Sequence, residues 1–156
     1  MRAAPSGASD SDWQVRCSTS GYVFFAAQCA VSYLSKKQDT IAMSTYQSEL
    51  TAASLASLEA VFLAGLTEQV TGRDVTPIDL GVDNKAAVDG SHDFISNSRV
   101  RPFERRQLKI RELVERGIVN VKWVATLDNI SDIFTKPLGY RLFEKFRKVL
   151  MNLPTA

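Results

Sequence analysis

One long segment without proline limits the possible folds of this chain more than any other feature. It begins with Ser44 and Gln47, which have the Ser-x-x-Gln spacing of a capping box and predict a helix over residues 44–70. Two apolar stripes recur at helical spacing, a large one of Leu55, Leu58, Phe62 and Leu66 and a small one of Ala52, Ala53, Ala56 and Ala60. We expect a helix that is apolar on most sides to be buried between a sheet and other elements.

The segments around this helix predict a mixed sheet. Strands are indicated by β-branched, aromatic or alternating residues at 21–27, 29–35, 78–83 and 118–124, with a first strand ending near Asp10. Further helices are predicted at 84–90, 99–116, 128–136 and 139–151. This order predicts an α/β fold in one domain over residues 10–151, with a poorly ordered N-terminal remnant at 1–9 and a tail at 152–156.

Composition excludes several classes of protein. The 156 residues are 45% apolar and 23% charged, as in a single globular domain. We find no run of about 18 apolar residues and expect no membrane partner. The start lacks the apolar stretch of a secretory signal, so we expect a cytoplasmic protein with Cys17 and Cys29 as free thiols. Because His92 is the only histidine, a four-ligand zinc site is not expected.

Charge is unevenly distributed along the chain. Residues 1–83 carry 5 basic and 9 acidic side chains, whereas residues 84–156 carry 14 and 8. An acidic half suits metal ions and a basic half suits phosphates, although solvated faces explain the same numbers.

Four carboxylates occupy unusual positions in this pattern. Asp10 stands at the end of the first strand, Glu49 in the first turns of the long helix, Asp83 at the end of an alternating strand, and Asp132 in an apolar frame. Carboxylates that meet from strand ends and a helix start can hold hard divalent cations. Each acid alone could equally be a cap, a turn residue or a surface charge. Asp12 is the alternative to Asp10, because it lies on the same face of the strand.

Several sequence motifs occur in an order that resembles a known family. They are 9–13 (SDSDW), 18–25 (STSGYVFF), 30–54 (AVSYLSKKQDTIAMSTYQSELTAAS), 82–87 (VDNKAA), 110–117 (IRELVERG), 121–138 (VKWVATLDNISDIFTKPL) and 141–150 (RLFEKFRKVL). Together they resemble the ribonuclease H domain that ends the Pol polyprotein of copia-type long-terminal-repeat retrotransposons, after the reverse transcriptase. The resemblance covers nearly the whole chain.

The resemblance implies a fold, an activity and a set of site residues. The fold is the ribonuclease H-like one, a five-stranded mixed sheet flanked by helices. The activity is hydrolysis of the RNA strand of RNA–DNA hybrids during reverse transcription, with two Mg²⁺ or Mn²⁺ ions. By motif, Asp10, Glu49, Asp83 and Asp132 correspond to the catalytic, metal-binding carboxylates. The implied partners are the hybrid and the reverse transcriptase domain of the same polyprotein, in the cytoplasm or a virus-like particle.

Candidate substrate contacts are less specific. Asn84 stands next to Asp83, and a basic segment contributes Arg101, Arg105 and Arg106, which could track a phosphate backbone or form a solvated helix face. The two tryptophans, Trp13 and Trp123, are expected in the core rather than as stacking platforms.

The chain also departs from the family. The approach to Asp10 is Ala-Pro-Ser-Gly-Ala-Ser, and glycine and proline weaken a strand that should lie centrally in the sheet. No histidine lies between Trp123 and Asp132, where many cellular ribonucleases H have one. The alternative function is therefore a catalytically dead nucleic-acid-binding module or a relic fragment of a Pol polyprotein.

Overall fold

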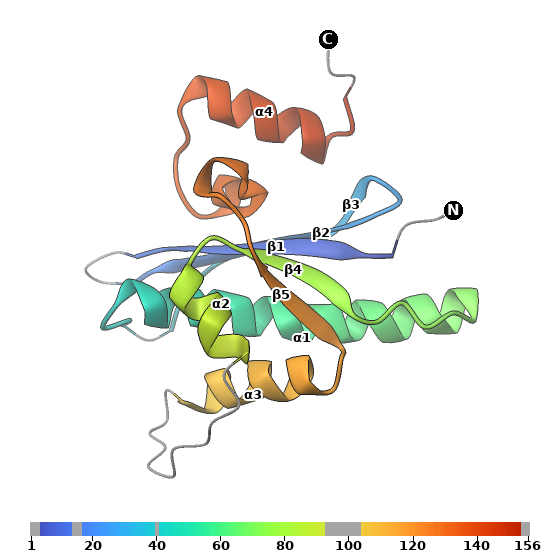
Figure 1. Cartoon of the computed structure of the whole chain (residues 1–156). Coiled ribbons are helices and arrows are strands. Elements are labelled where there is room, and N and C mark those ends of the chain that lie inside the picture. The colour runs from blue at the N-terminus through green and yellow to red at the C-terminus, as the bar shows by residue number, and fades with distance from the viewer. Residues whose placement is uncertain (1–3, 14–16, 40, 93–103, 154–156) are drawn as a thin grey trace.

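A five-stranded mixed sheet forms the centre of the protein, as predicted (Figure 1). The computed structural model describes residues 4–13, 17–39, 41–92 and 104–153. The strands are β1 (Ser6–Asp12), β2 (Thr19–Ala26), β3 (Cys29–Lys37), β4 (Ile78–Val82) and β5 (Val119–Trp123), in the spatial order β3-β2-β1-β4-β5. Strand β2 pairs antiparallel with both β1 and β3, whereas β4 runs parallel to both β1 and β5.

Strand β1 is the middle strand, and it begins earlier than expected. The prediction that residues 1–9 are a poorly ordered remnant is wrong for residues 6–9, which pair with both β2 and β4. Gly7 permits this placement, because a Cβ atom there would lie 2.4 Å from the ring of Phe24. The strand thus obtains its order from its two neighbours and from a fully buried phenylalanine, and not from its own β propensity.

The long helix α1 (Thr45–Thr71) begins at the predicted cap. The hydroxyl of Ser44 accepts a hydrogen bond from the Gln47 amide at 3.2 Å, and the Gln47 side chain accepts one from the Met43 amide at 2.7 Å. The helix ends at Gly72, whose φ of 67° is left-handed.

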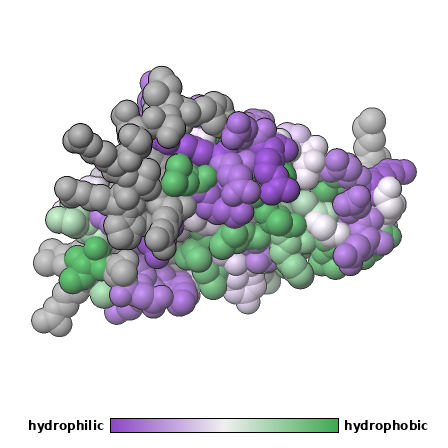
Figure 2. All heavy atoms as spheres, turned by 90° about the horizontal axis from the view of Figure 1, so that it is seen from below, coloured by the Kyte–Doolittle hydropathy of each residue, from purple (hydrophilic) through white to green (hydrophobic). Residues whose placement is uncertain are grey.

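The small stripe of α1, and not the large one, faces the sheet. Ala52, Ala56 and Ala60 are fully buried, whereas Leu58, Phe62 and Leu66 are exposed by 50%, 61% and 44%. The expectation that α1 is buried on most sides is therefore wrong. Figure 2 views the molecule from the side of the sheet on which α1 lies and shows hydrophobic side chains gathered on that surface. By length and composition α1 could cross a membrane, but more than half of its most apolar part is buried in the domain, as in a core helix.

Two further helices cover the same face of the sheet as α1, while a fourth lies on the opposite side (Figure 1). They are α2 (Lys85–His92), α3 (Glu104–Glu115) and α4 (Tyr140–Leu150), of which α4 is the one on the opposite side. The main core lies between the sheet and the first three helices and includes Leu50, Leu80, Ile110 and Leu113. The predicted start of α3 at residue 99 lies outside the described residues.

The segment before α4 differs from the predicted helix over 128–136. It consists of two short 3₁₀ helices, η1 (Thr126–Asp128) and η2 (Ile130–Phe134). Asn129 separates them, because its side-chain oxygen accepts hydrogen bonds from the backbone and hydroxyl of Ser131, which competes with continuous helical bonding. Asp132 therefore lies in a tight turn and not on the last helix.

Candidate active site

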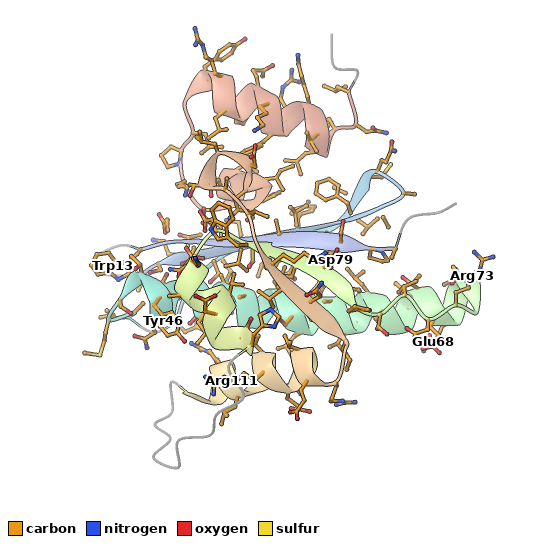
Figure 3. The ribbon with its side chains drawn as sticks, in the orientation of Figure 1. Trp13, Tyr46, Glu68, Arg73, Asp79 and Arg111 are labelled. Carbon is orange, nitrogen blue, oxygen red and sulfur yellow. The ribbon has the colours of Figure 1, made fainter. Side chains whose placement is uncertain are left out.

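Three of the four predicted carboxylates meet at one end of the sheet. Because β1 and β4 are parallel neighbours, with Ser9 paired to Val82, Asp10 and Asp83 emerge side by side. Glu49 reaches them from the second turn of α1. One carboxylate oxygen from each of Asp10, Glu49 and Asp83 lies within 4.8 Å of the others, and we call these three residues the acidic cluster. Figure 3 marks this end of the molecule by Trp13 and Tyr46, with Glu68 and Arg73 at the other end of α1.

Glu49 is the most strongly perturbed member of the acidic cluster. Its Oε1 accepts a hydrogen bond from the Ser11 amide at 3.3 Å, whereas its Oε2 is buried and has no hydrogen-bond partner among the described residues. Burial, and then the negative charges of Asp10 and Asp83, raise the pKa of Glu49 to about 9. A buried carboxylate oxygen without a donor is an energetic cost that a cation at this position would remove.

Asp10 and Asp12, the two candidates for the first acid, have different surroundings. Asp10 is 1% exposed and belongs to the acidic cluster. Asp12 is not part of that cluster, and its Oδ1 accepts a hydrogen bond from the Thr19 amide at 2.8 Å. Asp12 therefore helps to close the β1–β2 connection, although both aspartates point to the same face of the strand.

Asp132 lies next to Asp10 but is not one of the three clustered acids. It is 2% exposed, and burial followed by the charge of Asp10 raises its pKa to about 6. The Thr135 hydroxyl donates a short hydrogen bond to Asp10, and the Lys136 ammonium lies 3.0 Å from Asp132 Oδ1 and 3.6 Å from Asp10 Oδ2. The turn of η2 thus connects the fourth acid to the first.

A buried glutamine that was not among the predicted site residues connects the elements that carry the acidic cluster. Gln38 is 7% exposed, and its side-chain amide donates to the Ser20 hydroxyl at 2.9 Å, the Ser48 carbonyl at 3.0 Å and the Ser11 hydroxyl at 3.2 Å. These bonds join β2, α1 and β1 next to the positions of Glu49 and Asp10. The only sequence signal was its place in the motif at residues 30–54.

Comparison with known sequences gives a consistent set of relatives. No family model matches the chain. The chain is 28% identical over 142 residues to the retrovirus-related Pol polyprotein from transposon RE1 of Arabidopsis thaliana, which covers 88% of this chain and 10% of that protein. It is 27% identical over 135 residues to the Pol polyprotein from transposon TNT 1-94 of Nicotiana tabacum, with 86% and 10% covered. Homologues of this chain are retrovirus-related Pol polyproteins of transposons.

The chain spans about a tenth of the length of these Pol polyproteins. A shorter match, 44% identical over 70 residues, is to the secreted RxLR effector protein 161 of Plasmopara viticola, and it covers 42% of this chain and 49% of that protein.

Solved structures assign the fold. The ribonuclease H1 of Halobacterium salinarum superposes with a TM-score of 0.56 at 13% identity, covering 95% of this chain and 98% of that one. A ribonuclease H1 isolated from compost gives a TM-score of 0.61 at 11% identity, with 85% and 92% covered. The chain therefore has the ribonuclease H fold, as the sequence motifs predicted.

The candidate substrate contacts lie partly in the described portion of this ribonuclease H fold. The side-chain oxygen of Asn84 accepts a hydrogen bond from the Ala87 amide at 3.0 Å, so Asn84 caps α2 beside the acidic cluster. Arg106 donates to the Thr51 hydroxyl at 3.0 Å, which fixes a basic group of α3 against α1. Arg101 lies outside the described residues, and so does the side chain of Arg105.

The two tryptophans are not core residues, in contrast with our expectation. Trp13 is 50% exposed and donates from its indole nitrogen to the Ala42 carbonyl at 3.1 Å. Trp123 is 56% exposed and donates to the Asp83 carbonyl at 3.2 Å. Each ring uses its polar edge to fix backbone near the acidic cluster while much of its face remains in solvent.

Proposed function

We propose that this chain is a metal-dependent endonuclease that hydrolyses the RNA strand of RNA–DNA hybrids during retrotransposon reverse transcription. In this proposal it acts as the ribonuclease H domain of a Pol polyprotein and has the reverse transcriptase domain of that polyprotein as its partner. The observation that carries the proposal is the convergence of Asp10, Glu49 and Asp83 within 4.8 Å at one end of a ribonuclease H fold. The Pol homologues support the same role.

The donor set fits divalent cations. All its ligand atoms are carboxylate oxygens, which suit hard cations such as Mg²⁺ and Mn²⁺, and the buried Oε2 of Glu49 lacks a donor among the described residues. We propose that Asp10, Glu49 and Asp83 hold the metal, with Asp132 completing the site. Two such ions supply an activated water and stabilise the leaving oxygen of a phosphodiester.

The protein's own contribution is to position these groups and to bind substrate. The Ser11 amide and the Thr135 hydroxyl fix one oxygen each of Glu49 and Asp10, so the two carboxylates have little freedom to reorient. Asn84 lies directly after Asp83, where its side chain could contact a sugar or phosphate. We propose that Arg101, Arg105 and Arg106 track the backbone of the hybrid, whose 2′-hydroxyls distinguish RNA from DNA.

The decisive experiment is cleavage of a labelled RNA–DNA hybrid by the purified chain, with Mg²⁺ or with chelator, beside single-stranded RNA and duplex DNA. We expect metal-dependent loss of the RNA strand of the hybrid alone. Glu49→Gln should abolish cleavage, whereas Glu68→Gln, on the exposed far end of the same helix, should not.

Two results would contradict the nuclease. Cleavage that survives Glu49→Gln would exclude the acidic cluster as its source. Binding of the hybrid by a folded chain without any cleavage would favour the alternative, a catalytically dead nucleic-acid-binding module.

A further inference from the structure

Lys136 brings a positive charge to the candidate active site. Its ammonium contacts Asp132 at 3.0 Å and Asp10 at 3.6 Å, and those two side chains are only 2% and 1% exposed. Among the ion pairs between described residues, these are the only two that involve a carboxylate exposed by less than a tenth. The other pairs lie at the surface, where an ion pair contributes little to stability.

The backbone conformation of the turn at residues 132–136 places the Lys136 ammonium next to the acids. Lys136 follows Asp132 by four residues, and its amide donates to the Asp132 carbonyl at 3.1 Å. The preceding residue, Thr135, donates through its hydroxyl to Asp10. Two consecutive side chains of one turn therefore contact the same buried carboxylate.

The charge balance of the site explains why such a cation is needed. Burial, and then the negative charge of Asp10, raises the pKa of Glu49, Asp83 and Asp132, so four acidic groups share one partly buried space. Burial opposes the charge of Lys136, but the carboxylates, Asp10 foremost, raise its pKa above the usual value. Like charges that are buried together are unfavourable unless a cation compensates them.

We propose that Lys136 is a built-in counter-ion that stabilises the metal-free site and competes with the divalent cation for Asp10 and Asp132. This inference rests on the proposed metal site. Lys136 acts through the carboxylates and is therefore a positioning residue. The Lys136 ammonium and a divalent cation that bind the same carboxylates repel each other. A bound metal ion must therefore either displace the ammonium from these carboxylates or bind more weakly because of it.

The test compares melting temperatures of the full chain with chelator and across a Mg²⁺ titration. With chelator, Lys136→Gln should have a lower melting temperature than wild type. At saturating Mg²⁺ most of this difference should disappear. The Mg²⁺ concentration at the midpoint of the titration should be lower than for wild type by roughly five-fold or more. Lys136→Arg keeps the charge and should stay near wild type with chelator. The matched control is Lys145→Gln, which removes a surface lysine paired with Asp128 at 2.6 Å and should leave the Mg²⁺ midpoint unchanged.

A purely structural lysine would behave differently. In that case Lys136→Gln would lower the melting temperature equally with and without Mg²⁺ and leave the midpoint unchanged, and the proposal would be overturned. Should Lys136→Gln fail to fold, the double variant with Asp132→Asn removes one charge of each sign and is expected to fold.

A second measurement separates this inference from the metal proposal. If the wild-type chain does not respond to Mg²⁺, the metal site fails, but the counter-ion role is still decided by a double-mutant cycle of Lys136→Gln and Asp132→Asn in chelator. Coupled losses of stability support the counter-ion, and additive losses overturn it.

Discussion

The side-chain amide of Asn129 donates a hydrogen bond to the backbone carbonyl of Ser9 at 3.0 Å, across 120 residues of sequence. Ser9 directly precedes Asp10 in the central strand, and Asn129 directly precedes η2, which carries Asp132. One fully buried amide thus holds the C-terminal turn against the strand that provides the first acid.

Asn129→Ala should destabilise the protein more than an ordinary surface change. It removes a buried donor to Ser9 and the acceptor for Ser131, so we expect a loss of about 1–3 kcal/mol in the free energy of unfolding, measured by urea denaturation. Gln69→Ala, on an exposed glutamine of α1, should change it by less than about 0.5 kcal/mol. Equal losses in the two variants would contradict this role for Asn129.

Glu49 should make the metal-free protein less stable as pH rises. Its folded pKa of about 9 lies above its ordinary value of 4.5, so between these values the folded state holds a proton that the unfolded state has lost. The free energy of unfolding therefore falls with pH across this range, by up to about 1.4 kcal/mol per pH unit for one proton. Burial raises the pKa of Asp132 to about 6, which adds a fall in the same direction at lower pH.

The measurement is urea unfolding with chelator at a series of pH values. Glu49→Gln should flatten the dependence between pH 6 and 9, because the amide cannot ionise. Glu68→Gln serves as the control on the same helix and should keep the wild-type slope. Parallel profiles for wild type and Glu49→Gln would show that Glu49 titrates normally.

Gly21→Ala should disturb the site from the sheet side. Gly21 pairs with Asp10 in the register of β1 and β2, and a Cβ there would lie 2.7 Å from Thr135 Cγ2 and 2.9 Å from Phe134 Cβ. The turn η2 must then shift, with a loss of about 1–3 kcal/mol in stability. Gly65→Ala, in an open helical position, should instead stabilise by about 0.5–1 kcal/mol. Thermal unfolding of both variants checks the opposite signs.

Arg106→Gln should weaken binding of the RNA–DNA hybrid in chelator, where no cleavage intervenes. If Arg106 contacts one phosphate, the slope of log affinity against log salt should become shallower by about one. Arg116→Gln removes an equivalent charge at the other end of α3, where Arg116 pairs with Glu112 at 3.2 Å, and should leave the slope unchanged. A slope that is identical in wild type and Arg106→Gln would remove Arg106 from the interface.

The regular elements with strong local signals were predictable from sequence. The cap at Ser44 predicted the start of α1, and the alternation of residues 78–82 predicted β4. Both signals are local. The length of strand β1 was underestimated, because its residues lack β propensity and its order depends on the packing of Phe24 over Gly7.

Other parts of the site depend on distant contacts that periodicity does not encode. Helical spacing identified two apolar stripes on α1 but could not say that close approach to the sheet selects the alanines. The turn around Asp132 follows from the bond between Asn129 and Ser9, and the contacts of Gln38 join three elements. The acids themselves were predicted by motif, and their convergence required the parallel pairing of β1 with β4.

The order of the acids along the chain has a consequence for synthesis. Asp10 is made before the other acids, but its strand completes its pairing only after residues 78–82 exist, and the turn with Thr135 and Lys136 is made later still. Because chains emerge from the ribosome from the N-terminus at about 5–20 residues per second, the acidic cluster precedes its closing turn by several seconds. A nascent chain would therefore carry an incomplete site until residues 132–136 have been made.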